Sequence, residues 1–358
     1  LIAPDKFAGT LTAVEAARAI ATGWQRFAPD DETDLAPMAD GGPGFVEVLR
    51  EAAGGELLAV TVRGPFGDPV PATLLLDGTT AYVESAQACG LHLTEKRRPE
   101  EAGTYGVGEL LLAALEAGAR RIVVGLGGSG STDGGAGLLA ALGASADRPL
   151  DAGNAGLRGV TRVDVAAARA RLEGVEVVAA SDVDNPLTGL FGAAKVFGPQ
   201  KGIPEERLPA VDGVLEELAA ATDRRTALEK GAGAAGGLGY GLLMVGAVRR
   251  PGIGVVADAV GLPARARAAD LVITGEGAFD FSSRAGKVPY GVALVAGEAV
   301  RPCIVLAGQS LVGAREMRAL GVESAYSLVE LVGEERAFAD PAGALAELAE
   351  RVARTWSR

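Results

Sequence analysis

The sequence contains few of the residues on which many protein classes depend. Its 358 residues include two cysteines and one histidine. Two cysteines cannot form a disulfide framework for a chain of this length, so Cys89 and Cys303, each in an apolar context, are expected to be buried thiols. A single imidazole, His92, excludes the zinc sites and histidine relays that need two.

Long apolar runs and an excess of positive charge are also missing. The apolar stretches fall far short of the roughly 20 residues that a membrane span needs. The formal net charge of −12 disfavours nucleic acid, although local backbone N–H groups can still bind a small anion. The first residues show no basic region followed by an apolar stretch, as a secretory signal would. We therefore expect a cytoplasmic protein that binds neither membranes nor nucleic acids.

Short apolar strands alternate with Ala-rich helices at both ends of the chain, which indicates an α/β protein. Thr12 and Glu15 predict a capping box at the start of a helix that ends near Phe27, and a last helix is expected from about Pro341. In these two terminal regions of the chain, strands are expected at 1–3, 33–36, 271–274, 303–306 and 325–328. Their spacing is typical of a parallel sheet.

The middle of the chain differs from its ends. Strands are expected at 57–63, 70–76, 80–85, 121–125 and 175–180, and helices at 106–117, from 134, and at 205–221 and 238–248. Asp77-Gly78 is a hairpin signal, so the first of these strands should be antiparallel. The sequence therefore predicts a Rossmann-like parallel-sheet domain, residues 1–56 plus 256–358, with a second α/β domain of mixed sheet, residues 57–255, inserted into it.

The strongest local feature is the glycine-rich segment 125–135, which follows a predicted strand and opens a predicted helix. Closely spaced glycines let backbone N–H groups face a phosphate, and a helix N-terminus adds a favourable dipole. Candidate nucleotide-binding residues are Gly127, Gly128, Ser129, Thr132, Gly134 and Gly135. A tight turn without a ligand is the alternative, and the glycine-rich segment 231–239 could exchange roles with this one.

Acidic residues and scarce lysines lie beside other predicted strand ends. Asp182 and Asp184 follow the strand at 175–180, where they could hold Mg²⁺ beside nucleotide phosphates, and Asp182 could also deprotonate a substrate hydroxyl. Only six of the 34 basic residues are lysines, which favours a specific need for a compact ammonium where one remains. Candidate substrate-binding residues are Asp5, Asp40, Gly41, Lys201, Glu276 and Lys287, with Lys6 beside the reacting groups. Helix caps and surface lysines are the alternative roles.

Eight short segments, taken in their order along the sequence, resemble the bacterial glycerate kinase family over essentially the whole chain. The matching segments are APDKF at 3–7, PMADGG at 37–42, TYGVGE at 104–109, GLGGSGSTDGG at 125–135, SDVDNPL at 181–187, FGPQKG at 197–202, GAGAAGGLG at 231–239 and TGEG at 274–277. The resemblance implies phosphorylation of D-glycerate by ATP and Mg²⁺, giving 2- or 3-phosphoglycerate, in a cleft between two domains. Asp182 and Lys6 are then expected to be catalytic, with Asp182 and Asp184 as metal ligands.

Three positions depart from the family's usual residues. Ala8, Pro43 and Ala278 stand where two cations and one carboxylate are usual, and Ser282-Ser283 replaces a Gln-Thr pair. Lost charges in a phosphoryl-transfer site weaken transition-state stabilisation. The chain is therefore predicted to be a divergent member. A member that binds a sugar acid or nucleotide with weak or no kinase activity is the alternative, and the oligomeric state, a homodimer included, is left open.

Two other chemistries fit the sequence less well. With 52 glycines in the chain, the dinucleotide pattern at 125–130 is expected about once by chance, which disfavours an NAD-dependent dehydrogenase. A phosphatase that forms a phosphoaspartate at Asp182 would need a hydroxyl residue where Pro186 stands. Neither alternative explains the other acidic loops.

Overall fold

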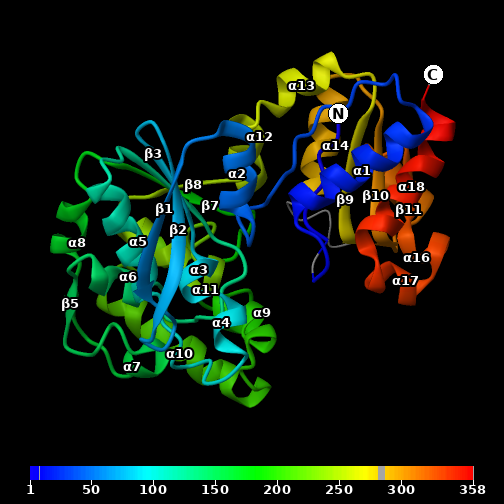
Figure 1. Ribbon diagram of the computed structural model, residues 1–358. Helices are drawn as coiled ribbons and strands as arrows, with labels where there is room; N and C mark the ends of the chain where they lie inside the picture. Colours follow the sequence, from blue (N-terminus) through cyan, green and yellow to red (C-terminus); the bar gives the residue numbers. More distant parts are fainter. Residues whose placement is uncertain (8, 281–286, 358) are drawn as a thin grey trace. The chain divides into compact units, whose positions relative to one another are not determined.

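The computed structural model describes residues 1–7, 9–280 and 287–357, so Ala8 and Ser282-Ser283 lie outside the described residues (Figure 1). The chain separates into two compact units. The first unit comprises Leu1–Asp40, Glu47–Ala53 and Ile253–Arg358, and the second comprises Gly41–Val46 and Gly54–Gly252. Both units are α/β, as the sequence predicts, and each is described by itself below.

The first unit is built on a parallel sheet. Its strands are β9 (Val272–Phe279), β10 (Cys303–Ser310) and β11 (Ser324–Ser327), in the order β11-β10-β9. Ile2 extends the sheet beyond β9 through single parallel bridges to Ile273 and to Leu35. The predicted strands at 1–3 and 33–36 are therefore reduced to isolated bridges, but they keep the predicted parallel direction.

Helices complete the first unit. They are α1 (Ala13–Phe27), α12 (Gly252–Ala259), α13 (Leu262–Ala268), α14 (Val288–Glu298), α15 (Ala314–Ala319), α16 (Leu328–Val332), α17 (Glu334–Ala339), α18 (Pro341–Trp356) and most of α2 (Phe45–Ala53). The predicted capping box begins α1: the Glu15 N–H donates to Thr12 Oγ1 at 3.2 Å, and the Thr12 N–H donates to Glu15 Oε2 at 2.9 Å. Ile20 of α1, Leu345 of α18 and Leu306 of β10 share one apolar core.

The second unit contains a mixed six-stranded sheet. Its strands are β1 (Glu56–Arg63), β2 (Pro69–Asp77), β3 (Thr80–Glu84), β4 (Arg121–Gly125), β7 (Glu176–Ala180) and β8 (Val248–Arg250), in the order β1-β2-β3-β4-β7-β8. The pairs β1-β2 and β2-β3 are antiparallel and the others are parallel. Asp77 pairs with Thr80 across the predicted hairpin turn, where Gly78 has a φ of +58°. The strands β5 (Ser145–Ala146) and β6 (Val163–Asp164) form a separate small sheet.

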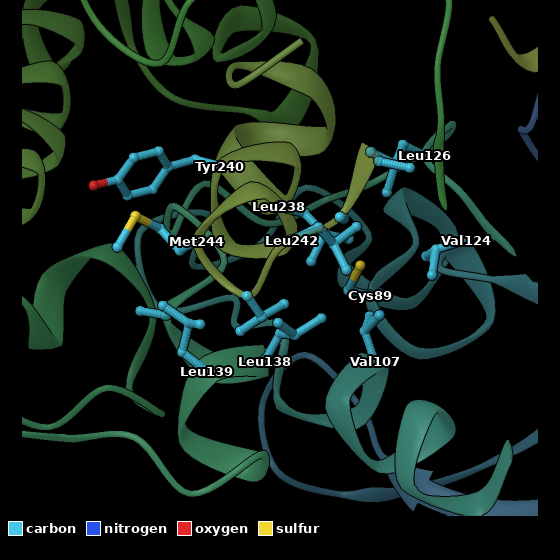
Figure 2. Close-up of a cluster of buried hydrophobic side chains, with 14 of the residues drawn as sticks. Cys89, Val107, Val124, Leu126, Leu138, Leu139, Leu238, Tyr240, Leu242 and Met244 are labelled. Atoms are coloured by element: carbon cyan, nitrogen blue, oxygen red, sulfur yellow. The ribbon is translucent and has the colours of Figure 1, made fainter. Parts of the chain in front are cut away.

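An apolar core joins the helices of the second unit. They are α3 (Ala86–Cys89), α4 (Leu91–Thr94), α5 (Tyr105–Glu116), α6 (Ala136–Ala141), α7 (Gly153–Gly156), α8 (Ala166–Arg171), α9 (Ala193–Phe197), α10 (Leu208–Ala221) and α11 (Ala234–Met244), with 3₁₀ helices η1 (Pro199–Lys201), η2 (Glu205–Arg207) and η3 (Thr226–Leu228). Figure 2 shows Leu238 of α11, Leu138 of α6 and Cys89 of α3 in this core, and all three are fully buried. This packing holds the two glycine-rich segments in place.

Two element ends differ from the sequence prediction, and pairing between strands explains both. The helix predicted to reach Val248 ends at Met244, and Val248 instead begins β8 by pairing with Val178 of β7. The strand β9 continues past Thr274 because its later residues pair with β10. None of the helices in the described ranges combines the length and the apolar character that a membrane crossing requires.

Candidate active site

Asp5 and Lys6 lie at the carboxyl edge of the sheet of the first unit. The Asp5 N–H donates to the carbonyl of Gly275 in β9 at 2.8 Å, so this segment runs beside the strand. Lys6 Nζ lies 3.6 Å from Asp5 Oδ1 and 3.8 Å from Asp40 Oδ1. Because ligands of parallel sheets bind beyond the carboxyl ends of the strands, this ammonium and its two carboxylates stand where a substrate is expected.

A second ion-pair group lies at the same sheet edge. Glu276 follows Gly275 in β9 and is 6% exposed. The Nζ of Lys287, the residue before α14, lies 3.9 Å from Glu276 Oε2 and 3.8 Å from Asp280 Oδ1. The structure therefore brings together, within the first unit, five residues that the sequence assigns to the site: Asp5, Lys6, Asp40, Glu276 and Lys287.

The Asp5 carboxyl titrates in an unusual range. Asp5 is 8% exposed, and this burial raises the pKa of its carboxyl to about 6. The nearby Asp40 carboxylate acts in the same direction, whereas the Lys6 ammonium lowers the pKa. The Lys6 N–H also donates to Asp5 Oδ1 at 2.8 Å. A carboxyl with a pKa of about 6 is mostly ionised at neutral pH and is suited to accept a proton from a bound hydroxyl there.

In the second unit, only the start of the glycine-rich segment 125–135 reaches the surface. Gly128 is exposed and Gly127 is half-buried, whereas Ser129 is 6% exposed. The Gly127 N–H donates to the carbonyl of Gly41 at 3.0 Å, and a Cβ on Gly127 would lie 2.3 Å from Gly42 Cα. The predicted residue Gly41 therefore supports this segment in the second unit. Within the segment 125–135, the backbone is therefore open to a phosphate at Gly127 and Gly128.

The rest of the segment is fastened internally by Asp133. This buried carboxylate accepts hydrogen bonds from the N–H groups of Gly135 at 3.0 Å and Gly137 at 3.1 Å, and from the Thr104 N–H at 2.9 Å and hydroxyl at 2.8 Å. Burial raises the pKa of Asp133. The first N–H groups of α6 are thus satisfied inside the protein. Of the predicted nucleotide-binding residues, Thr132, Gly134 and Gly135 are fully buried, and the structure places them where they shape the segment.

The two glycine-rich segments, which the sequence presents as alternatives for phosphate binding, pack directly against each other. Ala235, Gly236 and Gly237 have φ values of +52°, +71° and +90°, which turn the chain at the start of α11. The Gly134 N–H donates to the Gly236 carbonyl at 3.1 Å, and a Cβ on Gly236 would lie 1.9 Å from the Ser131 carbonyl oxygen. The segment 231–239 therefore supports the segment 125–135 from inside.

Lys201 lies behind the accessible part of the segment 125–135. Its Nζ donates to Ser129 Oγ at 2.9 Å and to the Ser131 carbonyl at 2.5 Å, and the residue is 2% exposed. Burial lowers the pKa of Lys201 to about 8, and the nearby Asp133 carboxylate opposes the shift. The sequence assigns Lys201 to substrate binding, but in this conformation its ammonium contacts the protein rather than solvent.

The two aspartates after β7 have different surroundings. Arg249 Nη2 lies 2.7 Å from Asp184 Oδ1, and Lys230 Nζ lies 3.0 Å from Asp184 Oδ2. The hydrogen bond from Lys230, aided by the Arg249 charge, lowers the pKa of Asp184. Asp182 is half-buried. The structure therefore places Asp184 in an ion-pair group of the second unit.

These surroundings decide how well a magnesium ion fits. The described residues contain no group of three or more acidic, histidine or cysteine side chains that could hold a metal. Mg²⁺ commonly uses one or two carboxylates and takes its other ligands from water and phosphate. Asp182, a half-buried acid that follows β7, is the candidate for that role. Asp184 does not fit, since both of its oxygens are bonded to cations.

Two buried acids have roles that the sequence reasoning missed. Asp133 organises the start of α6, and Glu84 accepts the Gly44 N–H at 3.0 Å, which ties the 41–46 segment to β3. The only sequence signal for Asp133 is its position as the single acid within the glycine-rich segment. Nothing in the sequence distinguishes Glu84 from other acids at strand ends.

The fold and these residues define a class: an α/β enzyme with an acid–lysine cluster at a sheet edge and an accessible glycine turn suited to a small anion. The model of the Glycerate kinase family matches residues 1–357. A glycerate kinase of Haemophilus influenzae is 43% identical over 321 residues, which cover 86% of this chain and 85% of the relative. The glycerate 2-kinase of Escherichia coli is 38% identical over 346 residues, which cover 93% of this chain and 91% of the relative.

A solved structure gives the same result for the fold. The crystal structure assigned to glycerate kinase 2 of Salmonella typhimurium LT2 matches with a TM-score of 0.83 and 38% identity, and the match covers 99% of this chain and 96% of that one. The chain belongs to the glycerate kinase family. It is a kinase of that family, with two α/β units.

Proposed function

We propose that this protein transfers a phosphoryl group from ATP to D-glycerate and produces a phosphoglycerate in the cytoplasm. Membership of the family and the names of the relatives support the reaction. Within the structure, the observation that carries the proposal is the position of Lys6 between Asp5 and Asp40, at the sheet edge where a hydroxy acid can bind. The Lys6 ammonium can offset the charge of the substrate carboxylate or of the transferring phosphoryl group.

The donor side of the reaction is assigned to the second unit. The accessible turn at Gly127 and Gly128 receives nucleotide phosphates, with the Gly128 N–H and the adjacent Ser129 hydroxyl as the candidate donors to phosphate oxygens. Asp182 would hold Mg²⁺, which supplies charge neutralisation on the phosphates when it is bound. The buried residues Thr132, Gly134 and Gly135 keep this turn in shape.

The acceptor side is assigned to the first unit. Asp5, Lys6, Asp40, Glu276 and Lys287 form the candidate site for the hydroxy acid. In the transfer step, the substrate hydroxyl oxygen bonds to the γ-phosphorus, the bond between that phosphorus and ADP breaks, and the hydroxyl proton passes to a carboxylate.

Two carboxylates are candidates to accept that proton. The sequence points to Asp182, whereas burial gives Asp5 a pKa of about 6. Replacing each by asparagine separates the two roles. The base variant should lose kcat with little change in the KM of D-glycerate, while loss of a metal ligand should raise the KM of Mg-ATP.

The proposal is tested by measuring ADP release from Mg-ATP across a panel of hydroxy acids, with phosphorus NMR to identify the product. Turnover with D-glycerate, and a product phosphorylated at one hydroxyl, is the expected result. Turnover only with another acid would assign a different acceptor. A folded protein that binds ATP or glycerate without turnover would favour the second candidate function, a binding protein, which the departures Pro43 and Ala278 support.

A further inference from the structure

The segment 125–135 depends on a distant residue for its conformation. Thr132 Oγ1 is buried without a hydrogen-bond partner among the described residues, so this hydroxyl does not fasten the segment, and the Ser131 hydroxyl faces the buried thiol of Cys89. Lys201, which is 72 residues from Ser129 in the sequence, bonds to the segment on both sides of Gly130. It thereby fixes the Ser129 side chain and the Ser131 carbonyl at the same time.

The surroundings of Lys201 leave it little freedom to move. Lys201 is the last residue of the 3₁₀ helix η1. The next residue, Gly202, has a φ of +91°, and a Cβ there would lie only 2.8 Å from the Lys96 carbonyl oxygen, so a side chain does not fit at this position. On the other side, a Cβ on Gly236 would lie 2.7 Å from Lys201 Nζ. The ammonium is therefore confined between η1, the segment 125–135 and the turn at Gly236.

These contacts also keep the Lys201 ammonium away from solvent. The residue is 2% exposed, and the Ser129 hydroxyl to which it donates lies next to the accessible glycines 127 and 128. A hydrogen bond from an ammonium orients this hydroxyl and polarises it toward donating its own hydrogen to an anion. Lys201 can thus act on a phosphate through Ser129 without contacting it.

We propose that Lys201 is a positioning residue for the nucleotide: it holds residues 127–131 in the conformation that receives the phosphates, and it does not bind the hydroxy acid. The inference rests on the proposed function only in naming ATP as the ligand. It gives this lysine a different role from the substrate binding that the sequence suggests.

The test compares Lys201→Met, which keeps the length of the side chain but removes the ammonium, with Lys96→Met at an exposed lysine of the same unit. The affinity for Mg-ATP should fall about tenfold in Lys201→Met, as expected for the loss of a charge-assisted bond, while the KM of D-glycerate stays unchanged. Backbone hydrogen exchange of residues 126–133, measured without any ligand, should be faster in this variant and unchanged in Lys96→Met.

Each result of these measurements either supports or overturns the positioning role of Lys201. Unchanged exchange in a folded Lys201→Met variant would overturn the proposal, and so would a raised KM of D-glycerate with unchanged ATP affinity. If Lys201→Met does not fold, Ser129→Ala serves instead: it removes a phosphate donor as well as one of the two Lys201 bonds, so its readout is the exchange of residues 126–133 without ligand, which should be faster than in the wild type. If the wild-type protein binds no ATP, the proposed function fails, whereas the exchange comparison still shows whether Lys201 orders the segment.

Discussion

Lys6 Nζ stands between two carboxylates of the first unit, 3.6 Å from Asp5 Oδ1 and 3.8 Å from Asp40 Oδ1. The ammonium lowers the pKa of Asp5, and burial and the Asp40 charge raise it, with a net value of about 6. The three residues therefore form one electrostatic group. A change at Lys6 must alter both the charge offered to a substrate and the pH at which Asp5 loses its proton.

The first prediction concerns Lys6. Lys6→Met should lower kcat/KM for D-glycerate by about 100-fold, the range found when one group that stabilises transition-state charge is removed. Since Lys6 holds the pKa of Asp5 down, the acid limb of the pH–rate profile, expected near pH 6, should move to higher pH in this variant. Lys6→Arg keeps the charge and should keep the limb near its original position. A limb that does not move in Lys6→Met would show that Asp5 does not control it.

The second prediction concerns Gly236. A Cβ there would lie 1.9 Å from the Ser131 carbonyl oxygen, at a φ of +71°. Gly236→Ala should lower the free energy of unfolding by about 2–4 kcal/mol through strain and overpacking, and it should weaken ATP binding. Gly246→Ala is the matched control, since Gly246 has a φ of +93° but no atom within 4 Å of its Cβ position. It should lose only about 1 kcal/mol. Denaturant unfolding of both variants measures the difference, and equal losses would contradict the steric account.

The third prediction separates the two aspartates after β7. Asp182→Asn should raise the Mg²⁺ concentration needed for half-maximal activity by about tenfold, because a metal ligand loses its charge. Asp184→Asn should leave this concentration unchanged, since Asp184 is bonded to Lys230 and Arg249. Titration of activity with Mg²⁺ at saturating ATP checks both variants. A larger effect in Asp184→Asn would return that residue to the metal site.

The fourth prediction concerns stability and pH. Burial lowers the pKa of Lys201 from 10.5 to about 8 in the folded protein, against the opposing effect of the Asp133 carboxylate. Between these two values the unfolded chain binds more protons at this residue, so the contribution of Lys201 to stability rises as pH increases from about 8 to 10. The stability gap between the wild type and Lys201→Met should change in that direction over this interval. Chemical unfolding at several pH values measures it, and a constant gap would contradict the buried, partly neutral amine.

Local signals in the sequence predict much of the fold. The capping box of Thr12 and Glu15 and the hairpin at Asp77-Gly78 depend on neighbouring residues, and both are present in the structure. The strand β8 and the end of β9 depend on partners that are distant in the sequence, namely β7 and β10. No local pattern at Val248 records such pairing.

The candidate site shows the same division. Residue type and position beyond a strand were sufficient to select Asp5, Lys6 and Glu276, which the structure brings to one sheet edge. The burial of individual site residues could not be predicted from the sequence. It places Lys201 and Thr132 inside the second unit, although their segments look like ligand-binding loops.

The most direct test of the account is the initial rate of ADP formation by the wild-type protein with Mg-ATP and D-glycerate, measured beside Lys6→Met and Lys201→Met. The account predicts turnover by the wild type, a loss in Lys6→Met that appears as lower kcat/KM for D-glycerate, and a loss in Lys201→Met that appears as a higher KM for ATP. The absence of turnover with D-glycerate in a folded wild-type protein that binds Mg-ATP would contradict it.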